Sequence, residues 1–387
     1  MPKLIALLIF CAPFFSSAQT LSHYSDISIL TIGPGNNLND SFGHSAIRVK
    51  DYVMNYDLVF DFGRYDFNTP NFYLKFAQGQ LDYELGVSYF EEFFDNYVLQ
   101  GRSIKSQTLN LTVQQRQQFF AFLLNNSLPE NNSYRYDFFY DNCANKIPKV
   151  LEQVLNDSLT YDRSKVIKSK TFRDLIYECV DKNSWGSFGI DLALGSIIDR
   201  EISLEDQLFL PKYVHQNLES TKLSEGQSLV KKSETLLESE PKTTEASLFS
   251  PFVVLSFSGI LILILTFLDY KKKRQSKLLD ALLFLITGIV GLIVLLLWFA
   301  TDHSATAFNY NLLWAFAPNI FMVPVVYKKT PVRWLSRYIK FLILLIILMG
   351  IHVLSGIQVF SLALLPFIFA LVIRYIYLLF HFKSVIK

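Results

Sequence analysis

Five apolar segments in the C-terminal third of the chain constrain its fold more than any other feature of the sequence. They cover roughly residues 249–268, 278–300, 311–327, 340–356 and 358–380. An α-helix needs about 20 consecutive apolar residues to cross the hydrocarbon core of a bilayer. The sequence therefore predicts a five-helix membrane domain at residues 249–387. The third segment is short and contains Pro318 and Pro324, so we expect it to be broken or tilted.

Lysine and arginine are concentrated in alternate connections between these segments. They follow the first segment (residues 271–277), the third (328–340) and the fifth (383–387), and the other connections are nearly free of them. Loops rich in lysine and arginine remain in the cytoplasm. The pattern thus predicts a multi-pass protein of the inner (cytoplasmic) membrane, with everything before residue 249 on the outer side.

The N-terminus has the features of a secretory signal peptide. Lys3 precedes an apolar stretch at residues 4–15, and Ser16, Ser17 and Ala18 form a small-residue cleavage site. We expect residues 1–18 to be removed, and Cys11 with them. The alternative is an anchor helix that is not cleaved. Export agrees with the topology that the basic loops predict.

The remaining sequence divides into a mixed, aromatic-rich region and a polar one. Residues 19–217 alternate strand-like and helix-like patterns, which predicts an α+β domain. Residues 218–248 lose aromatic side chains and are rich in Ser, Thr, Glu and Lys, so we expect a solvated linker. The hydrophobic share of 51% is too high for a soluble protein, and the net charge of +2 favours no nucleic-acid partner.

Cys143 lies in the sequence YDFFYDNCANK at residues 136–146, after an aromatic run and before an apolar-periodic segment. Asn142 is a suitable N-cap, which would put Cys143 in the first turn of a helix. The partial positive charge of a helix N-terminus favours a thiolate. Backbone N–H groups at this helix start, that of Ala144 among them, are candidates to stabilise an oxyanion.

His44 is the candidate base for this cysteine, and it lies in SFGHSAIRV at residues 41–49. Residues 46–49 and 59–62 both have strand patterns. If these strands pair as a hairpin, the start of the first faces the end of the second, which brings His44 near Asp61. A carboxylate there would orient the imidazole and stabilise its charged form. The alternative is that Asp61 is an ordinary surface carboxylate.

Cys179 offers a structural alternative for Cys143, because two cysteines in an oxidising compartment can form a disulfide. Cys179 falls on a helical stripe with Phe172, Leu175 and Ile176. That spacing favours a small core residue rather than a disulfide partner.

The connection at residues 301–311 is polar for a short membrane loop, and it lies on the same side of the membrane as Cys143. It contains Asp302 and His303. Either the loop completes the site at the membrane surface or it is an ordinary interfacial connection.

The order His44 then Cys143 is that of permuted papain-like folds of the NlpC/P60 or lecithin–retinol acyltransferase type. The two sequences quoted above, the DFG at residues 61–63, Gly101-Arg102 and the five apolar segments resemble the Lnb family of lipoprotein N-acyltransferases. The resemblance covers nearly the whole mature chain. It implies transfer of an acyl chain from a phospholipid, through a Cys143 thioester, to the terminal amine of a lipoprotein, with no cofactor. Lys146 and Pro148 depart from the regular helix start expected there.

Two other functions remain open from the residues. One is a papain-like cysteine hydrolase that cleaves peptidoglycan peptides or lipids, and the other is a non-enzymatic envelope receptor or scaffold with a structural disulfide. The sequence has no metal-ligand spacing, no phosphate-binding loop and no basic aromatic patch for nucleic acid.

Overall fold

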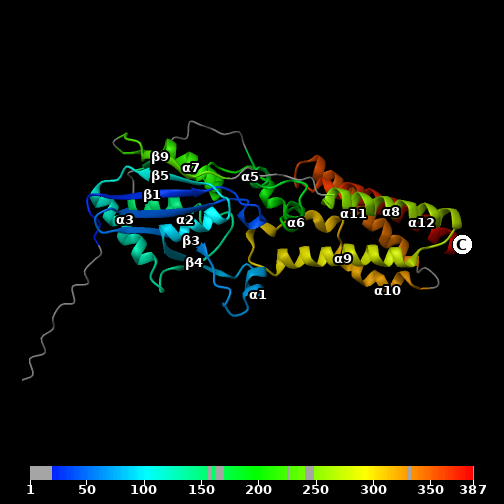
Figure 1. The fold of residues 1–387 in the computed structure, drawn as a ribbon. Helices are drawn as coiled ribbons and strands as arrows, with labels where there is room; N and C mark the ends of the chain where they lie inside the picture. Colours follow the sequence, from blue (N-terminus) through cyan, green and yellow to red (C-terminus); the bar gives the residue numbers. More distant parts are fainter. Residues whose placement is uncertain are drawn as a thin grey trace, which may run out of the picture.

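The computed structural model describes residues 20–155, 159–161, 170–224, 226–239, 248–328 and 333–386. A domain built on a β-sheet lies at one end and a bundle of long apolar helices at the other (Figure 1). The α+β prediction is confirmed for the N-terminal part. The predicted signal peptide and Cys11 lie outside the described residues.

A seven-stranded sheet forms the N-terminal domain, in the order β6-β4-β3-β2-β1-β5-β9. Its strands are β1 (Ser25–Ile32), β2 (His44–Asp51), β3 (Tyr56–Arg64), β4 (Asp82–Tyr89), β5 (Ile104–Leu109), β6 (Ser133–Arg135) and β9 (Val230–Leu237). Neighbouring strands are antiparallel throughout. The predicted hairpin is present, because β2 pairs with β3 in a register that puts Ile47 opposite Phe60.

Seven helices accompany the sheet in the described residues: α1 (Phe72–Ala77), α2 (Phe90–Leu99), α3 (Val113–Asn126), α4 (Lys146–Leu155), α5 (Phe172–Cys179), α6 (Trp185–Ala193) and α7 (Pro211–Ser220). Helices α3 and α4 bury one sheet face in a core that includes Phe60, Phe120 and Leu151. Helix α2 covers part of the other face. Thr112 caps the start of α3, because the backbone N–H of Gln115 donates to Thr112 Oγ1 at 3.2 Å.

Strand β9 corrects the predicted linker at residues 218–248. It pairs with β5 and forms an edge of the main sheet, and β8 (Lys222–Leu223) pairs with β7 (Leu159–Thr160). Its sequence is polar because a sheet edge faces water, and charged side chains such as Lys231 and Lys232 protect such an edge from pairing with another chain. The alternating apolar pattern that identifies buried strands is therefore weak here.

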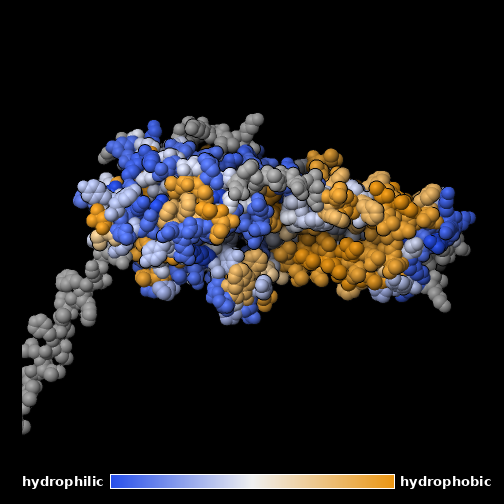
Figure 2. Space-filling model, in the orientation of Figure 1, coloured by the Kyte–Doolittle hydropathy of each residue, from blue (hydrophilic) through white to orange (hydrophobic). Residues whose placement is uncertain are grey.

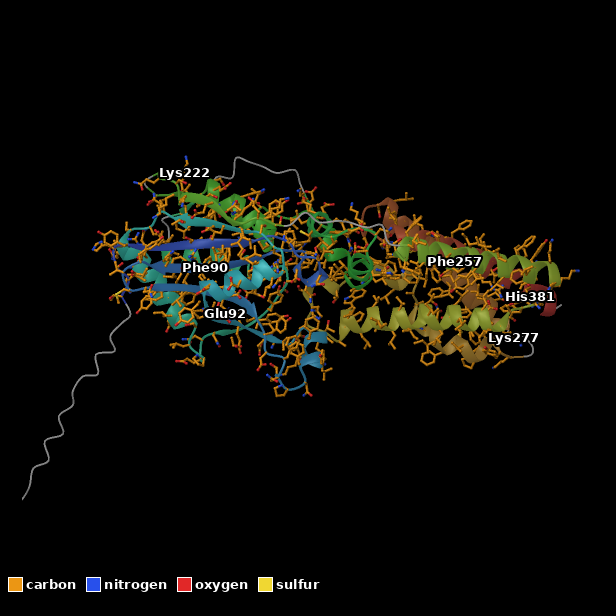
Figure 3. The ribbon with its side chains drawn as sticks, in the orientation of Figure 1. Phe90, Glu92, Lys222, Phe257, Lys277 and His381 are labelled. Atoms are coloured by element: carbon orange, nitrogen blue, oxygen red, sulfur yellow. The ribbon has the colours of Figure 1, made fainter. Side chains whose placement is uncertain are left out.

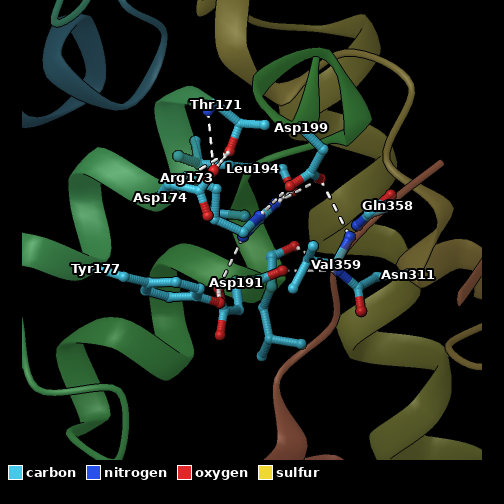
Figure 4. Close-up of polar contacts among 12 residues, drawn as sticks. Thr171, Arg173, Asp174, Tyr177, Asp191, Leu194, Asp199, Asn311, Gln358 and Val359 are labelled. Carbon is cyan, nitrogen blue, oxygen red and sulfur yellow. Dashed lines mark hydrogen bonds and ion pairs between the residues drawn. The ribbon is translucent and has the colours of Figure 1, made fainter. Parts of the chain in front are cut away.

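A buried cluster of one arginine and two aspartates connects the two parts of the chain (Figure 4). Arg173 donates to Asp191 at 2.7 Å and to Asp199 at 2.6 Å, and its side chain is 1% exposed. Asp199 accepts the backbone N–H of Val359 at 3.2 Å, and the Asn311 amide donates to the backbone carbonyl of Asp191 at 2.9 Å. These contacts fix the sheet domain on the helical bundle.

Four helices of the bundle are long and apolar enough to cross a membrane, as judged over the described residues. They are α8 (Pro251–Lys272), α9 (Lys277–Phe299), α11 (Arg333–Leu354) and α12 (Leu365–Ile386). Apolar side chains cover the bundle surface in Figure 2. Four of the five predicted membrane helices are therefore confirmed as long apolar helices. The third apolar segment is not one long helix, and it is broken as its prolines led us to expect.

That third segment still runs the length of the bundle. At one end the Asn309 amide donates to the backbone carbonyl of Leu192 in the sheet domain, at 2.8 Å. At the other end Lys277 Nζ donates to the carbonyls of Tyr327 and Lys328, at 3.1 and 2.8 Å. Lys277 lies at the end of the bundle far from the sheet (Figure 3). The segment therefore crosses the same depth as α9.

The segment consists of η6 (Tyr310–Leu313), η7 (Ala317–Met322) and α10 (Val323–Val326). A 3-10 helix rises about 2.0 Å per residue against about 1.5 Å in an α-helix, so fewer residues cover the distance. Gly288 of α9 lets the irregular backbone approach, because a Cβ there would lie 2.6 Å from the backbone nitrogen of Ile320. Irregular backbone is tolerated at membrane depth where protein buries it.

Candidate active site

His44 and Asp61 meet at the end of the β2–β3 hairpin, as the sequence predicted. His44 begins β2, and Asp61 follows Phe60, the residue paired with Ile47. His44 Nε2 hydrogen-bonds the Asp61 carboxylate. Arg64 Nε donates to the other carboxylate oxygen at 3.1 Å. The carboxylate is thus held between two basic groups, and His44 keeps only its Nδ1 for another partner.

The pKa of His44 is raised and that of Asp61 is lowered. Burial disfavours the charged imidazole, but the charges of Cys143 and Asp61 outweigh it and raise the pKa of His44 well above its ordinary value. Burial also acts to raise the pKa of Asp61, yet His44 and Arg64 lower it overall. The site therefore favours an imidazolium beside a carboxylate, and Cys143 is near enough for its charge to act on His44.

Cys143 lies in the turn that leads into α4, three residues before the helix begins at Lys146. The expectation that it sits within the first helical turn is corrected by this small shift. Two asparagines hold the turn: Asn142 Oδ1 accepts the backbone N–H of Asn145 at 3.0 Å, and Asn145 Oδ1 accepts that of Asn142 at 2.7 Å. This reciprocal pairing is the capping-box arrangement.

Asn142 is more deeply engaged than an ordinary cap. Its Nδ2 donates to the carbonyls of Phe138 at 2.7 Å and Phe209 at 2.8 Å, and the residue is 3% exposed. Its Oδ1 also accepts the Ala144 N–H at 2.8 Å. Asn142 thus orients the turn as expected. The Ala144 N–H, which we expected to face an oxyanion, is already donated to this side chain.

Gly63 and the Tyr134 hydroxyl both lie close to Cys143. A Cβ added to Gly63 would be 3.7 Å from Cys143 Cβ and 4.0 Å from Tyr134 Oη, and the φ of +97° at Gly63 disfavours any side chain. The Tyr134 hydroxyl is buried, with no hydrogen-bond partner in the described part of the protein. Burial and the charge of Cys143 raise the pKa of Tyr134, so its hydroxyl stays protonated.

Tyr134 is the site residue that sequence reasoning missed. Its only signal was its place in the short strand before Cys143.

Lys146 stabilises the ring of Tyr134, with Nζ 4.0 Å from the ring centre, and forms an ion pair with Asp141 at 2.9 Å. Pro148 is the third residue of α4, in its first turn, where a proline is tolerated. The two departures at the helix start are therefore accommodated.

The loop with Asp302 and His303 packs against the sheet domain beside the cysteine turn. The Asp302 N–H donates to the Gln78 carbonyl at 2.8 Å. His303 lies against Gly79, whose added Cβ would be 3.1 Å from the ring. These contacts reach the segment after α1 and not His44 or Cys143. Ser304 makes the nearer link: its hydroxyl donates to Asp137, in the aromatic turn before Cys143, at 2.8 Å.

Cys143 and Cys179 are both free cysteines in the structure, so the disulfide is not formed. Cys179 ends α5 and packs against the apolar cluster around Phe172, as its stripe predicted. Burial and the neighbouring Glu178 raise the pKa of Cys179 to about 11. Within the described ranges no three His, Cys, Asp or Glu side chains are arranged to hold a metal ion.

Two family models match the chain. The Lnb N-terminal periplasmic domain matches residues 16–177, and the Lnb transmembrane domain matches residues 243–384. No curated protein and no solved structure matches it. His44, Asp61 and Cys143 lie in the first matched region, and Asp302 and His303 lie in the second.

Proposed function

We propose that this chain, which belongs to the Lnb family, is a membrane-bound lipoprotein N-acyltransferase with Cys143 as its nucleophile. The observation that carries the proposal is the hydrogen-bonded pair of His44 and Asp61 near the end of β3, where Gly63 approaches Cys143. The charges of Cys143 and Asp61 raise the pKa of the imidazole. A cationic histidine beside a cysteine favours the thiolate that attacks esters.

The first half of the reaction forms a thioester. The Cys143 thiolate attacks the ester carbonyl of a phospholipid, and the carbonyl oxygen becomes an oxyanion. When the tetrahedral intermediate collapses, the bond to the glycerol oxygen breaks. His44 gives its proton to that oxygen, and a lysophospholipid leaves. Because His44 Nε2 is bonded to Asp61, the proton moves at Nδ1.

The second half transfers the acyl chain to nitrogen. The terminal α-amine of a diacylglyceryl-cysteine lipoprotein attacks the thioester, neutral His44 takes the amine proton, and the Cys143 thiolate leaves. The products are an N-acylated lipoprotein and the starting enzyme. Both substrates are anchored in lipid, so a site fixed at the bilayer surface turns their encounter into a positioned reaction.

Two residues assist in this scheme. Asp61 orients the imidazole and stabilises its charged form, the third role of a catalytic triad. The Tyr134 hydroxyl, buried near Cys143 and without a hydrogen-bond partner among the described residues, donates to the oxyanion. Tyr134 takes the part first assigned to the Ala144 N–H, because that group donates to Asn142.

The chain order and the setting of these residues support a permuted papain-like domain. His44 lies on a strand, and Cys143 precedes the helix that packs on the sheet. We assign residues 19–217 together with β9 to the periplasmic domain and residues 249–387 to the inner membrane. The basic connections then face the cytoplasm.

The test is a mass spectrum of lipoprotein N-terminal peptides from cells that have or lack this gene. Cells that carry Cys143→Ser should lose the amide-linked acyl chain as completely as cells without the gene. Cys179→Ala is the matched control, a cysteine change in the same domain, and should retain the chain. If the amine is acylated in all samples of a strain without a second N-acyltransferase, the proposal is wrong. Release of free fatty acid by Cys143 would then indicate a hydrolase.

A further inference from the structure

The segment at and before α1 exposes large apolar side chains that nothing in the sheet domain covers. Tyr73 is 80% exposed, Phe67 67%, Leu74 57% and Phe76 55%, whereas Phe72 of the same helix is buried. We call the first four residues the α1 patch. An exposed cluster of this kind marks a contact with another apolar surface.

The α1 patch lies next to the end of the bundle that is nearer the sheet domain, where we expect the bundle to leave the membrane. Residues 78–80, which follow α1, contact Asp302 and His303, which come directly after α9. The rings of Trp298 and Phe308, which precede and follow these two residues in the sequence, lie 5.5 Å apart between centres in a tilted arrangement, and Phe308 is 53% exposed. Such aromatic side chains gather where lipid headgroups meet the acyl chains. In Figures 1 and 2, α1 stands beside the apolar surface of α9.

A line of aromatic rings continues from this helix toward the cysteine. Between ring centres, Phe72 lies 5.7 Å from Tyr65, and Tyr65 lies 5.3 Å from Tyr83. The ring of Tyr83 stacks on that of Tyr136, with 4.2 Å between their centres. Tyr83 is also paired with Tyr134 across β4 and β6. Tyr134 Oη and Cys143 Cβ lie 4.0 and 3.7 Å from the position that a Cβ at Gly63 would take, so this line of rings ends near the cysteine. Apolar ring faces thus connect the membrane level with the candidate active site.

We propose that the α1 patch inserts into the outer leaflet of the bilayer and that the donor phospholipid reaches Cys143 along these rings. The insertion follows from exposure, apolar character and continuity with the aromatic belt of the bundle. The delivery of lipid rests on the function proposed above. An apolar helix face at the headgroup boundary gains burial of its side chains and holds the domain surface against the lipid.

The location is tested with the full-length protein in nanodiscs of phosphatidylcholine brominated near the headgroup end of its acyl chains. Phe76→Trp puts a reporter in the patch. Tyr52→Trp is the control: it is 61% exposed at the tip of the β2–β3 hairpin, the far end of β2 from His44. The four native tryptophans are the common background. The fluorescence added by Phe76→Trp should be quenched, and that added by Tyr52→Trp should not. Equal, weak quenching of both overturns the proposal.

The functional part uses two acyl donors. Phe76→Asp with Leu74→Asp should lower transfer from bilayer phospholipid at least about tenfold, while acylation of Cys143 by p-nitrophenyl butyrate in water stays unchanged. Tyr52→Asp should change neither. Equal loss with both donors, or no loss with either, contradicts lipid delivery by the patch. If the wild type cannot be acylated at all, the proposed function fails, and the quenching result still decides the location of α1.

Discussion

The regions around Cys143 and Cys179 contain the same side chain in opposite surroundings. Cys143 precedes the N-terminal end of α4, and its charge helps to raise the pKa of His44. Cys179 is the last residue of α5, next to Glu178, and its pKa is raised to about 11. Helix N-termini and cations favour a thiolate, whereas helix C-termini, anions and burial disfavour it. The comparison teaches that the position of a cysteine on its helix and the charge beside it decide its chemistry.

Removing His44 should erase most of the difference in reactivity between Cys143 and Cys179. We expect His44→Gln to lower acyl transfer by about 10³-fold, because the imidazole handles the proton in both halves of the reaction. The measurement is single-turnover acylation of Cys143 followed by intact-protein mass spectrometry. A loss below tenfold would show that another group acts as the base.

Neutralising Asp61 should lower the activity of Cys143 and shift its pH dependence. We expect Asp61→Asn to lower transfer by roughly 10²-fold. The carboxylate charge contributes to the raised pKa of His44, so its removal lowers that pKa. Activity that needs protonated His44 falls as the pH rises through this pKa, and the alkaline limb of the pH–rate profile should move to lower pH. An unchanged limb would mean that Asp61 has no electrostatic role.

Changing Tyr134 should lower the acylation rate less, and Cys143 should remain more reactive than Cys179. We expect Tyr134→Phe to lower acylation by about tenfold, the net value of one ordinary hydrogen bond, with little effect on lipid binding. Steady-state kinetics should show the loss in kcat rather than in KM. The substitution keeps the ring under Lys146, so a large loss of thermal stability would point to a structural role instead.

The smallest effect is expected from Cys179. We expect Cys179→Ala to change transfer by less than about twofold, since the thiol packs among apolar side chains and is almost fully protonated at neutral pH. Iodoacetamide at pH 7 should label Cys143 in the wild type and leave Cys179 largely unmodified. Comparable labelling of both cysteines would remove the distinction between the regions.

Much of the candidate site could be predicted because it depends on local patterns. The apolar alternation on both sides of residues 50–56 predicted the hairpin, and hairpin geometry alone brings His44 to Asp61. The cap at Thr112 and the buried stripe of α5 also follow from spacings of three and four residues. These features need no knowledge of distant contacts.

The features that the sequence did not predict share one physical reason: each depends on contacts with residues that are distant in the sequence. Strand β9 is too polar to be recognised without its neighbour β5. The third apolar segment has the composition of a membrane helix, but its prolines and its packing on Gly288 keep it irregular. The Arg173 cluster joins charges that are about 20 residues or more apart in sequence, and no local pattern pairs them.

The sequence by itself determined the family resemblance, the direction of the chain across the membrane and the pairing of His44 with Asp61. Apolar runs, basic loops and hairpin spacing act over short stretches of chain, so they can be read directly. Tertiary structure alone decided that a tyrosine hydroxyl is buried near the cysteine and that the segment after α1 contacts Asp302. Both depend on how separate elements pack together, and that packing is a property of the whole fold.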